Sequence, residues 1–224
     1  MLVLKKLVPL SMFHQSQMKL SGYVGIGGIR LGSRWESQNT LVEKIQSVEE
    51  EGVYIQIFNP DAIISPKHLY YAVYFAEQAF ALSSNISKNK SIEFLIYASL
   101  QRQIKTAIDK VGFLIKGEKH RDTAYIVITA SSKSKVTSKY KEILSSLNAS
   151  SVKEMVPPLT SQKINQFLKK YMISDFELEN VLLCNGFPAG SKISDQNDDT
   201  KHQTFMSILS ERMAQLLMES FKSN

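Results

Sequence analysis

Hydrophobic and polar positions change period along the chain, and the pattern predicts helices interspersed with short strands. The clearest stretch begins at Asn59, where Asn59-Pro60-Asp61 forms a turn. Ser65-Pro66 then supplies an N-cap hydroxyl followed by a proline at the first helical position. A helix is therefore expected from Ser65 to about Ser83. Its apolar stripe consists of Leu69, Ala72, Val73, Ala76 and Phe80.

The same stretch continues to Gly112 with a second pair of predicted elements. Ile92–Ala98 is a short, continuous apolar run, which we interpret as a buried strand. Apolar residues from Ile104 to Val111 recur at helical spacing and predict a second helix. Gly112 follows where a left-handed C-terminal cap belongs.

The remaining pattern predicts a single domain with an α/β or α+β fold, in which a small mixed, largely antiparallel sheet is flanked by helices. The domain is expected to span residues 20–224, after a leader of residues 1–19, with a flexible loop at about 185–201 that is rich in Gly, Asp and Asn. Further strands are predicted at Gly22–Ile29, Val53–Phe58 and Thr123–Ala130. Further helices are predicted at Ser37–Val48, Lys139–Leu147, Ser161–Tyr171, from an Asp175 cap onward, and at Gln203–Phe221; Ser131–Lys135 is expected to be a polar loop and Val156–Leu159 to be extended.

The composition is that of an ordinary globular protein with a moderate basic excess. Among 224 residues the formal net charge is +6, which permits an acidic partner such as RNA but does not demand one. Cys184 is the one cysteine, so no intramolecular disulfide can form, and we expect a reducing, cytoplasmic environment. No apolar run approaches the roughly 20 residues that a membrane helix needs, so no membrane partner is expected.

Motifs for catalysis, metals and cofactors are absent from the sequence. The glycines of Gly22–Ile29 lack the Gly-Lys-Ser/Thr ending of a P-loop. Asp61 and Glu93 are the best-placed carboxylates; Asp61 most simply belongs to its turn, and Glu93 could pair with Arg102. The residues alone favour a binding or scaffold protein without a cofactor, and an enzyme with an unrecognised pocket stays open. The four histidines, none at metal-ligand spacing, are His14, His68, His120 and His202.

Donor-rich side chains gather at the start of the second predicted helix, in Gln101-Arg102-Gln103-Ile104. One interpretation is a solvated first turn with Ile104 packed beneath it. The other is a docking point for a phosphate or carboxylate, because free N–H groups, the helix dipole and an Arg fork all favour an anion there.

The order of these motifs resembles a known family. Residues 59–69, read with Ala72 and Ala76, resemble the kinase-binding small subunit of the KEOPS/EKC complex, the family of the PRPK-binding protein. So do Glu93–Ala98 with the following Arg102-Gln103-Ile104, and Glu211–Leu217 near the C-terminus. Gly27-Gly28 also matches, and the archaeal branch is the most similar. The chain departs from the pattern at Ser99-Leu100-Gln101, where a glycine is expected before the arginine, and in longer segments at 133–157 and 185–201.

The resemblance implies a non-catalytic protein. Members of the family bind the small atypical kinase/ATPase subunit of the complex, which in turn holds the threonylcarbamoyl-transferase subunit. The assembly makes N6-threonylcarbamoyladenosine in tRNA. Archaeal members also bind the 3′ CCA end of tRNA and so recruit the substrate.

The resemblance also implies two sets of binding residues, each with an alternative. The leading candidate for tRNA, Arg102, could instead form an ion pair with Glu93, and the candidates for the kinase could instead be core residues. Expected tRNA contacts are Arg102 and Gln103, then Lys105, Lys67, His68 and Arg30, with Ile104, Gly27 and Gly28 lining a surface for the bases. Expected kinase contacts are Phe205, Leu209, Met213 and Leu217.

Overall fold

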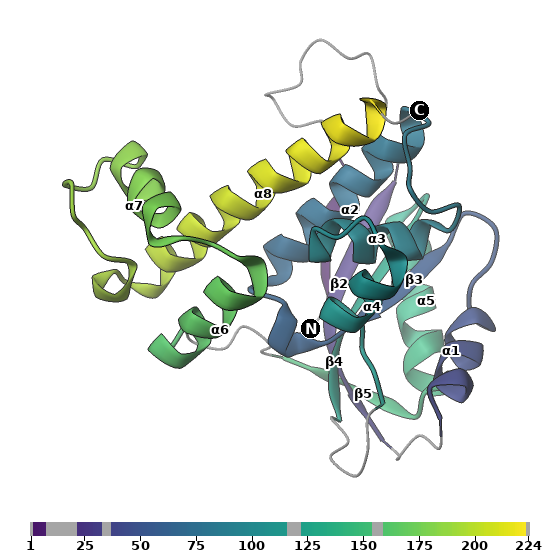
Figure 1. Cartoon of the computed structure of the whole chain (residues 1–224). Coiled ribbons are helices and arrows are strands. Elements are labelled where there is room, and N and C mark those ends of the chain that lie inside the picture. The colour runs from purple at the N-terminus through teal and green to yellow at the C-terminus, as the bar shows by residue number, and fades with distance from the viewer. Residues whose placement is uncertain (1, 8–21, 33–36, 116–121, 154–158, 223–224) are drawn as a thin grey trace.

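The computed structural model describes residues 2–7, 22–32, 37–115, 122–153 and 159–222. It contains an antiparallel sheet with the strand order β1-β2-β4-β3, and β5 lies on the same edge of β2 as β1 does. Helices cover both faces of this sheet (Figure 1), which confirms the predicted fold class. The strands are β1 (Val3–Lys6), β2 (Tyr23–Leu31), β3 (Tyr54–Phe58), β4 (Thr123–Ala130) and β5 (Ala149–Val152). The helices are α1 (Gln38–Gln46), α2 (Pro66–Ala81), α3 (Lys90–Ser99), α4 (Ile104–Val111), α5 (Lys133–Ser146), α6 (Ser161–Tyr171), α7 (Asp175–Cys184) and α8 (Asp198–Lys222), with short 3-10 turns at Pro60–Ala62 and Ile193–Asp195.

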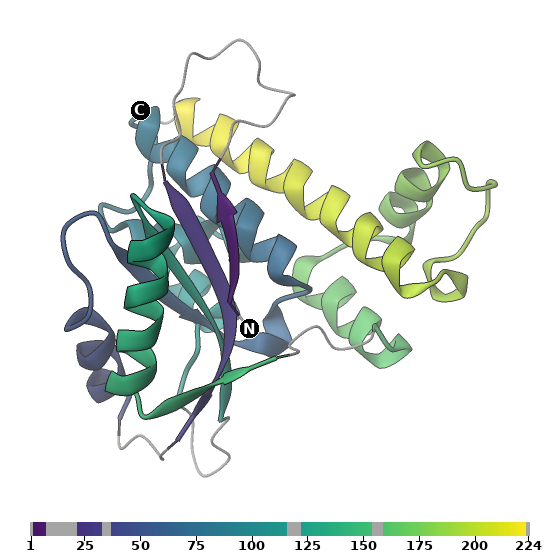
Figure 2. The ribbon, with the colours of Figure 1, turned by 180° about the vertical axis from the view of Figure 1, so that it is seen from behind.

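Two hydrophobic clusters sandwich the sheet because side chains alternate between its faces. On one face, residues such as Ile26 and Val127 join the larger cluster with α2, α3 and α8. On the other face, Ile29 and Ile128 join a smaller cluster with α1 and α5. Figure 2 shows α5 lying along this second face. The first part of α8 extends beyond the sheet and packs against α7 (Figure 1).

Glycines in β2 allow α5 to approach the sheet closely. A Cβ atom at Gly25 would lie 2.5 Å from Cγ1 of Val136, and one at Gly27 would lie 3.3 Å from the Tyr140 hydroxyl oxygen. Tyr140 donates a hydrogen bond of 3.3 Å to the carbonyl of Gly28. Gly27 and Gly28 are buried. These two glycines, which were expected to line an RNA-binding surface, are therefore covered in this structure, and α5 packs over Gly27.

The predicted strand Ile92–Ala98 is wrong, because these residues lie in α3. Asn89 caps this helix by accepting a hydrogen bond from the backbone N–H of Ser91 at 2.9 Å. Every residue from Glu93 to Ser99 is buried, since α2, α4, α8 and β3 surround the helix. A helix that is buried all round carries a continuous apolar run, which periodicity alone does not distinguish from a buried strand.

Several boundaries also differ from the prediction. Helix α5 begins at Lys133 with Ser132 as its cap, so the expected polar loop at Ser131–Lys135 contains the first helical turn. The cap of α7 is Ser174, which forms a capping box with Glu177. Helix α8 begins at Asp198, inside the predicted flexible loop.

The structure differs from the sequence prediction in the leader and at the end of the second predicted helix. Val3–Lys6, within the expected leader, pairs with β2. Gly112 has an extended backbone with φ −65°, so it is not the left-handed cap that was expected. Leu100 takes that conformation instead, with φ 57° and ψ 38° at the end of α3. Residues 156–158 of the predicted extended segment, His14 and His120 lie outside the described residues.

The contact between Gly25 and Val136 predicts the effect of one added methyl group. Gly25→Ala is expected to destabilise the protein by about 1–3 kcal/mol, because the new Cβ overlaps Cγ1 of Val136. Urea denaturation measures this change. In the double variant Gly25→Ala/Val136→Ala the overlap is gone, so the combined loss should be smaller than the sum of the two single losses. Strictly additive losses would contradict this packing explanation.

Candidate functional site

The turn between α3 and α4 presents the main predicted RNA-binding residues to solvent. Arg102, Gln103, Ile104 and Lys105 are all exposed, and Ile104 keeps 40% of its surface accessible although it is apolar. The left-handed Leu100 ends α3 and lets the backbone N–H of Gln101 return to the carbonyl of Ile96 at 3.2 Å. The turn is thus a fixed connection, and the four side chains lie at the N-terminal end of α4.

A buried junction holds this turn against the start of α2. Tyr171, the last residue of α6, donates hydrogen bonds to the carbonyls of Ala62 at 2.7 Å and Ala98 at 3.3 Å. His68 donates from Nε2 to the same Ala98 carbonyl at 3.0 Å. The first turn of α2, the end of α3 and the end of α6 therefore meet at one point. Lys67 is exposed next to this junction, close in sequence to His68.

His68 does not fit the predicted role of a phosphate contact. Its side chain is buried, and desolvation lowers the pKa of the imidazole from 6.5 to about 4. The ring is therefore neutral at physiological pH and has no access to a ligand outside the core. The hydrogen bond to Ala98 and the edge-on contact with the Tyr171 ring instead give it a structural role.

Arg30 lies away from this group of residues in the sheet. It occupies β2 opposite Ser150 of β5 and Thr123 of β4, and its Nε lies 3.3 Å from a carboxylate oxygen of Asp122. Among the predicted RNA contacts, Lys67 is next in sequence to His68, which contacts the end of α3, and its own amine lies 5.7 Å from the centre of the Tyr71 ring. The structure does not bring Gly27 or Gly28 to a surface.

Three further cations surround the junction, and sequence reasoning did not assign them to a site. The Lys110 amine lies 4.7 Å from the centre of the Tyr171 ring, and Lys170 donates to the Lys110 carbonyl at 3.2 Å. Arg212 donates to the carbonyls of Tyr171 and Met172. Burial, together with the positive charges of Lys170 and Arg212, lowers the pKa of Lys110 from 10.5 to about 8. The only sequence signal is Lys169-Lys170 at the end of α6, because the three residues come from three helices.

Glu93 and Asp61 have structural roles. The Glu93 carboxylate is buried and accepts hydrogen bonds from the backbone N–H groups of Ile86 at 3.0 Å and Ser87 at 2.7 Å. Burial raises the pKa of this carboxyl, while the two backbone bonds and the charge of Arg102 oppose the increase. Asp61 belongs to the turn as expected, because its N–H donates to Asn59 at 3.0 Å.

The predicted kinase contacts on α8 lie in the core. Phe205, Leu209 and Met213 have no accessible surface, and Leu217 keeps 6%. These side chains pack in the cluster with α2 and α3, so the structure gives them a core role, the alternative that the sequence left open, and does not present them as an exposed face. The exposed apolar residues of α8 are instead Met218 at 58% and Phe221 at 40%.

The described residues hold no group of three His, Cys, Asp or Glu side chains that could bind a metal ion. Among the helices of the described part of the chain, none combines the length and the apolar composition needed to cross a membrane.

Comparison with known proteins identifies the family. A family model described as kinase binding protein CGI-121 matches residues 36–215. The chain belongs to this family. The match covers the elements from α1 into α8 and confirms the family resemblance of the sequence motifs. A search of curated proteins finds no sequence that matches the chain.

The buried His68 predicts a specific pH dependence of stability. Its folded pKa of about 4 lies below its ordinary value of 6.5, so the unfolded chain binds a proton more readily. Stability should therefore fall as the pH drops from 6.5 towards 4, by up to roughly 3 kcal/mol from this residue. His68→Gln keeps an N–H donor for Ala98 without a titratable ring. Urea denaturation across this pH range should show a shallower loss for the variant, and equal slopes would contradict the assignment.

Proposed function

We propose that this protein is a non-catalytic accessory subunit of the KEOPS complex that binds the atypical kinase/ATPase subunit and recruits tRNA through its 3′ CCA end. Through the kinase it contacts the threonylcarbamoyl-transferase subunit indirectly, in the cytoplasm. Membership of a family of kinase-binding proteins carries the kinase part of the proposal. The sequence resemblance to the archaeal branch supports the tRNA part.

The exposed basic surface supports RNA binding by the α3–α4 turn. Arg102 and Lys105 stand at the N-terminal end of α4, where the helix dipole also favours a phosphate. The exposed Ile104 offers an apolar surface between them for a base. Lys67 is next in sequence to His68, which contacts the end of α3. This arrangement combines cations with an apolar contact, as proteins that bind single-stranded ends do.

Kinase binding requires an apolar surface, and the C-terminal part of α8 is our candidate. Met218 and Phe221 are exposed there, three residues apart and on adjacent positions of the helix surface. Methionine adapts to a partner surface, and large apolar side chains supply most of the binding energy in protein interfaces. This face replaces the buried residues that the sequence suggested.

The tRNA proposal predicts a loss of affinity when the turn loses its charges. Arg102→Ala/Lys105→Ala should weaken tRNA binding and reduce the salt dependence by up to about 0.7 log units per lost phosphate contact. A gel shift at several salt concentrations measures both quantities. Lys141→Ala, at an exposed position on α5, is the matched control and should leave both unchanged.

Comparing full-length tRNA with the same tRNA lacking CCA separates two functions. Loss of binding without CCA supports recruitment through the 3′ end. Unchanged affinity and slope in the double variant would remove the turn from the interface. Retained kinase binding with no tRNA binding would favour a second function, a protein-only scaffold or kinase regulator.

The kinase proposal predicts a loss of affinity for the kinase subunit when α8 loses its exposed apolar side chains. Met218→Asp/Phe221→Asp should weaken binding to the kinase subunit at least tenfold, because both apolar contacts are replaced by charges. Isothermal titration calorimetry measures the affinity, and circular dichroism confirms that the variant is folded. Leu183→Asp, at a residue of α7 with 51% of its surface exposed, is the control and should bind normally. Equal affinities for the two variants would place the kinase elsewhere.

A further inference from the structure

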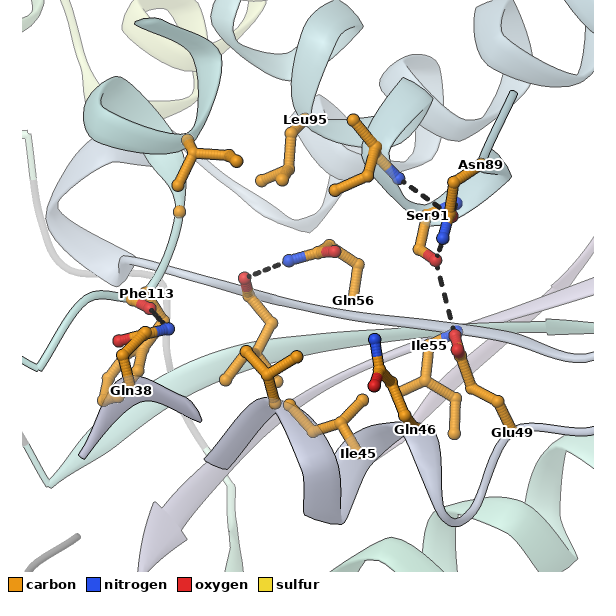
Figure 3. A pocket seen from close by; sticks show the side chains of 15 residues that line it. Gln38, Ile45, Gln46, Glu49, Ile55, Gln56, Asn89, Ser91, Leu95 and Phe113 are labelled. Atoms are coloured by element: carbon orange, nitrogen blue, oxygen red, sulfur yellow. Dashed lines mark hydrogen bonds between the residues drawn. The ribbon is translucent and has the colours of Figure 1, made fainter. Parts of the chain in front are cut away.

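A cavity lies along the outer edge of β3, between α1 on one side and α3 and α4 on the other. Its volume is about 140 Å³. Figure 3 shows Gln56 and Ile55 of β3 in the middle of it, Ile45 of α1 on one side and Leu95 of α3 on the other. The lining residues that are exposed to solvent include Val42, with 38% of its surface accessible, together with Gln46 and Asn89, so the cavity reaches the surface on this side. Ile45 and Leu95 thus face each other from two walls, and the edge strand forms the floor. The lining also contains polar side chains, namely Gln38, Gln46, Glu49, Asn89 and Ser91.

The outer edge of β3 carries the backbone N–H and C=O groups that point away from β4. β3 pairs with β4 on its inner side, and in an antiparallel strand alternate residues point their N–H and C=O groups outward. The N–H of Ile55 donates to Glu49 at 2.7 Å, and that of Asn59 donates to the Val111 carbonyl at 2.9 Å. Both bonds point away from β4, so the N–H and C=O of Ile57 point outward as well.

Two outward groups remain in the centre of the edge. The Ile57 carbonyl accepts the side-chain amide of Gln56 at 3.0 Å. Among the residues that the structure describes, the Ile55 carbonyl accepts no hydrogen bond and the Ile57 N–H donates none. Both residues line the cavity and are almost fully buried. An acceptor and a donor, two residues apart on an extended strand, therefore face the cavity. Buried backbone groups of this kind are normally paired.

The closed ends of the edge decide which ligand could pair with these groups. Glu49 occupies the edge at Ile55, and Phe58 forms a bridge with Gly112 at the other end. An extended peptide adds to a strand over several consecutive residues, and no such length is open here. A cavity of about 150 Å³ accommodates a benzene ring. The space therefore suits one flat ring that carries an acceptor next to a donor.

We propose that this cavity binds the six-membered ring of an adenine or cytosine base. In both bases a ring nitrogen that accepts a hydrogen bond stands beside an exocyclic amine that donates one. The ring nitrogen would accept from the Ile57 N–H, and the amine would donate to the Ile55 carbonyl. Ile45 and Leu95 would cover the two faces of the ring. The base can come from a free nucleoside or from the end of an RNA strand, and the proposal does not rest on the function proposed above.

Gln56 acts in this site as a movable polar group. Within the described part of the chain, its amide donates to the carbonyl of the next residue alone, a local bond that a ligand can replace at little cost. The amide then lies beside the bound ring and can pair with a further polar atom of the base. Glu49 contributes by fixing its end of the edge, since its carboxylate also accepts from the Ser91 hydroxyl at 3.3 Å.

The test uses the purified full chain with adenosine, cytidine, inosine and uridine, and with the trinucleotide CCA. Saturation-transfer NMR suits the weak binding expected of a ligand this small. Adenosine or cytidine should bind at least tenfold more tightly than inosine and uridine, in which the ring nitrogen is itself a donor. Val42→Trp should block the opening of the cavity and abolish binding. Lys44→Trp, at an exposed α1 residue that does not line the cavity, should bind as the wild type does.

Gln56→Leu provides a second variant that does not depend on blocking the opening, and it should weaken binding about tenfold. Binding of the nucleosides identifies a free base as the ligand, and binding of CCA alone identifies an RNA end. Either result supports the site if Val42→Trp abolishes it. No binding of any probe, or binding that survives both Val42→Trp and Gln56→Leu, overturns the proposal. Neither result depends on Arg102, Lys105 or the kinase, so it is independent of the proposed function.

Discussion

The position of the candidate RNA-binding surface depends on one buried hydroxyl group. Tyr171 donates to the carbonyls of Ala62 and Ala98, the first in the turn before α2 and the second at the end of α3. These carbonyls lie in the core, where an unpaired polar group costs about 1–3 kcal/mol. Burial also raises the pKa of Tyr171 well above its ordinary value, so the hydroxyl keeps its proton. The elements that carry Lys67 and Arg102 are held together by this group.

The same residue links the sheet domain to the helices that extend beyond it. Arg212 of α8 binds the carbonyls of Tyr171 and Met172 and also pairs with Glu177 of α7. Lys170 binds the end of α4. Cations at the C-terminal ends of helices are favourable because of the helix dipole. Part of the basic character near the junction therefore has a structural origin, which separates Lys170 and Arg212 from the exposed charges of the α3–α4 turn.

Local signals were sufficient for some elements and insufficient for others. The bounds of α6 and β4 agree with the sequence, because Thr160 caps an amphipathic helix and Thr123–Ala130 is rich in β-branched residues. The helix α3 was missed because its apolar run reflects burial on all sides, a tertiary property. The cap at Asn89 was the one signal that could have identified it.

The candidate site was predictable to a similar extent. Arg102 and Lys105 lie three residues apart at the start of α4, in a short polar stretch, so their exposure followed from the local pattern. The burial of His68 and Met213 did not, because it depends on which helices cover them. Lys110 was missed for the same reason, since its neighbours Lys170 and Arg212 come from distant segments. The position of β3 at the edge of the sheet could not be predicted from the sequence, because it depends on which strands pair.

Leu100 combines two requirements that usually fall on different residues. Its left-handed backbone costs roughly 1–2 kcal/mol for a residue with a Cβ, and its side chain packs against the larger core cluster. Glycine would relieve the backbone but lose the packing, and isoleucine or valine would keep the apolar character but strain the backbone further. A substitution that changed the backbone conformation of Leu100 would redirect the chain leading to Arg102, so the direction of the basic turn depends on a residue whose own side chain lies against the core.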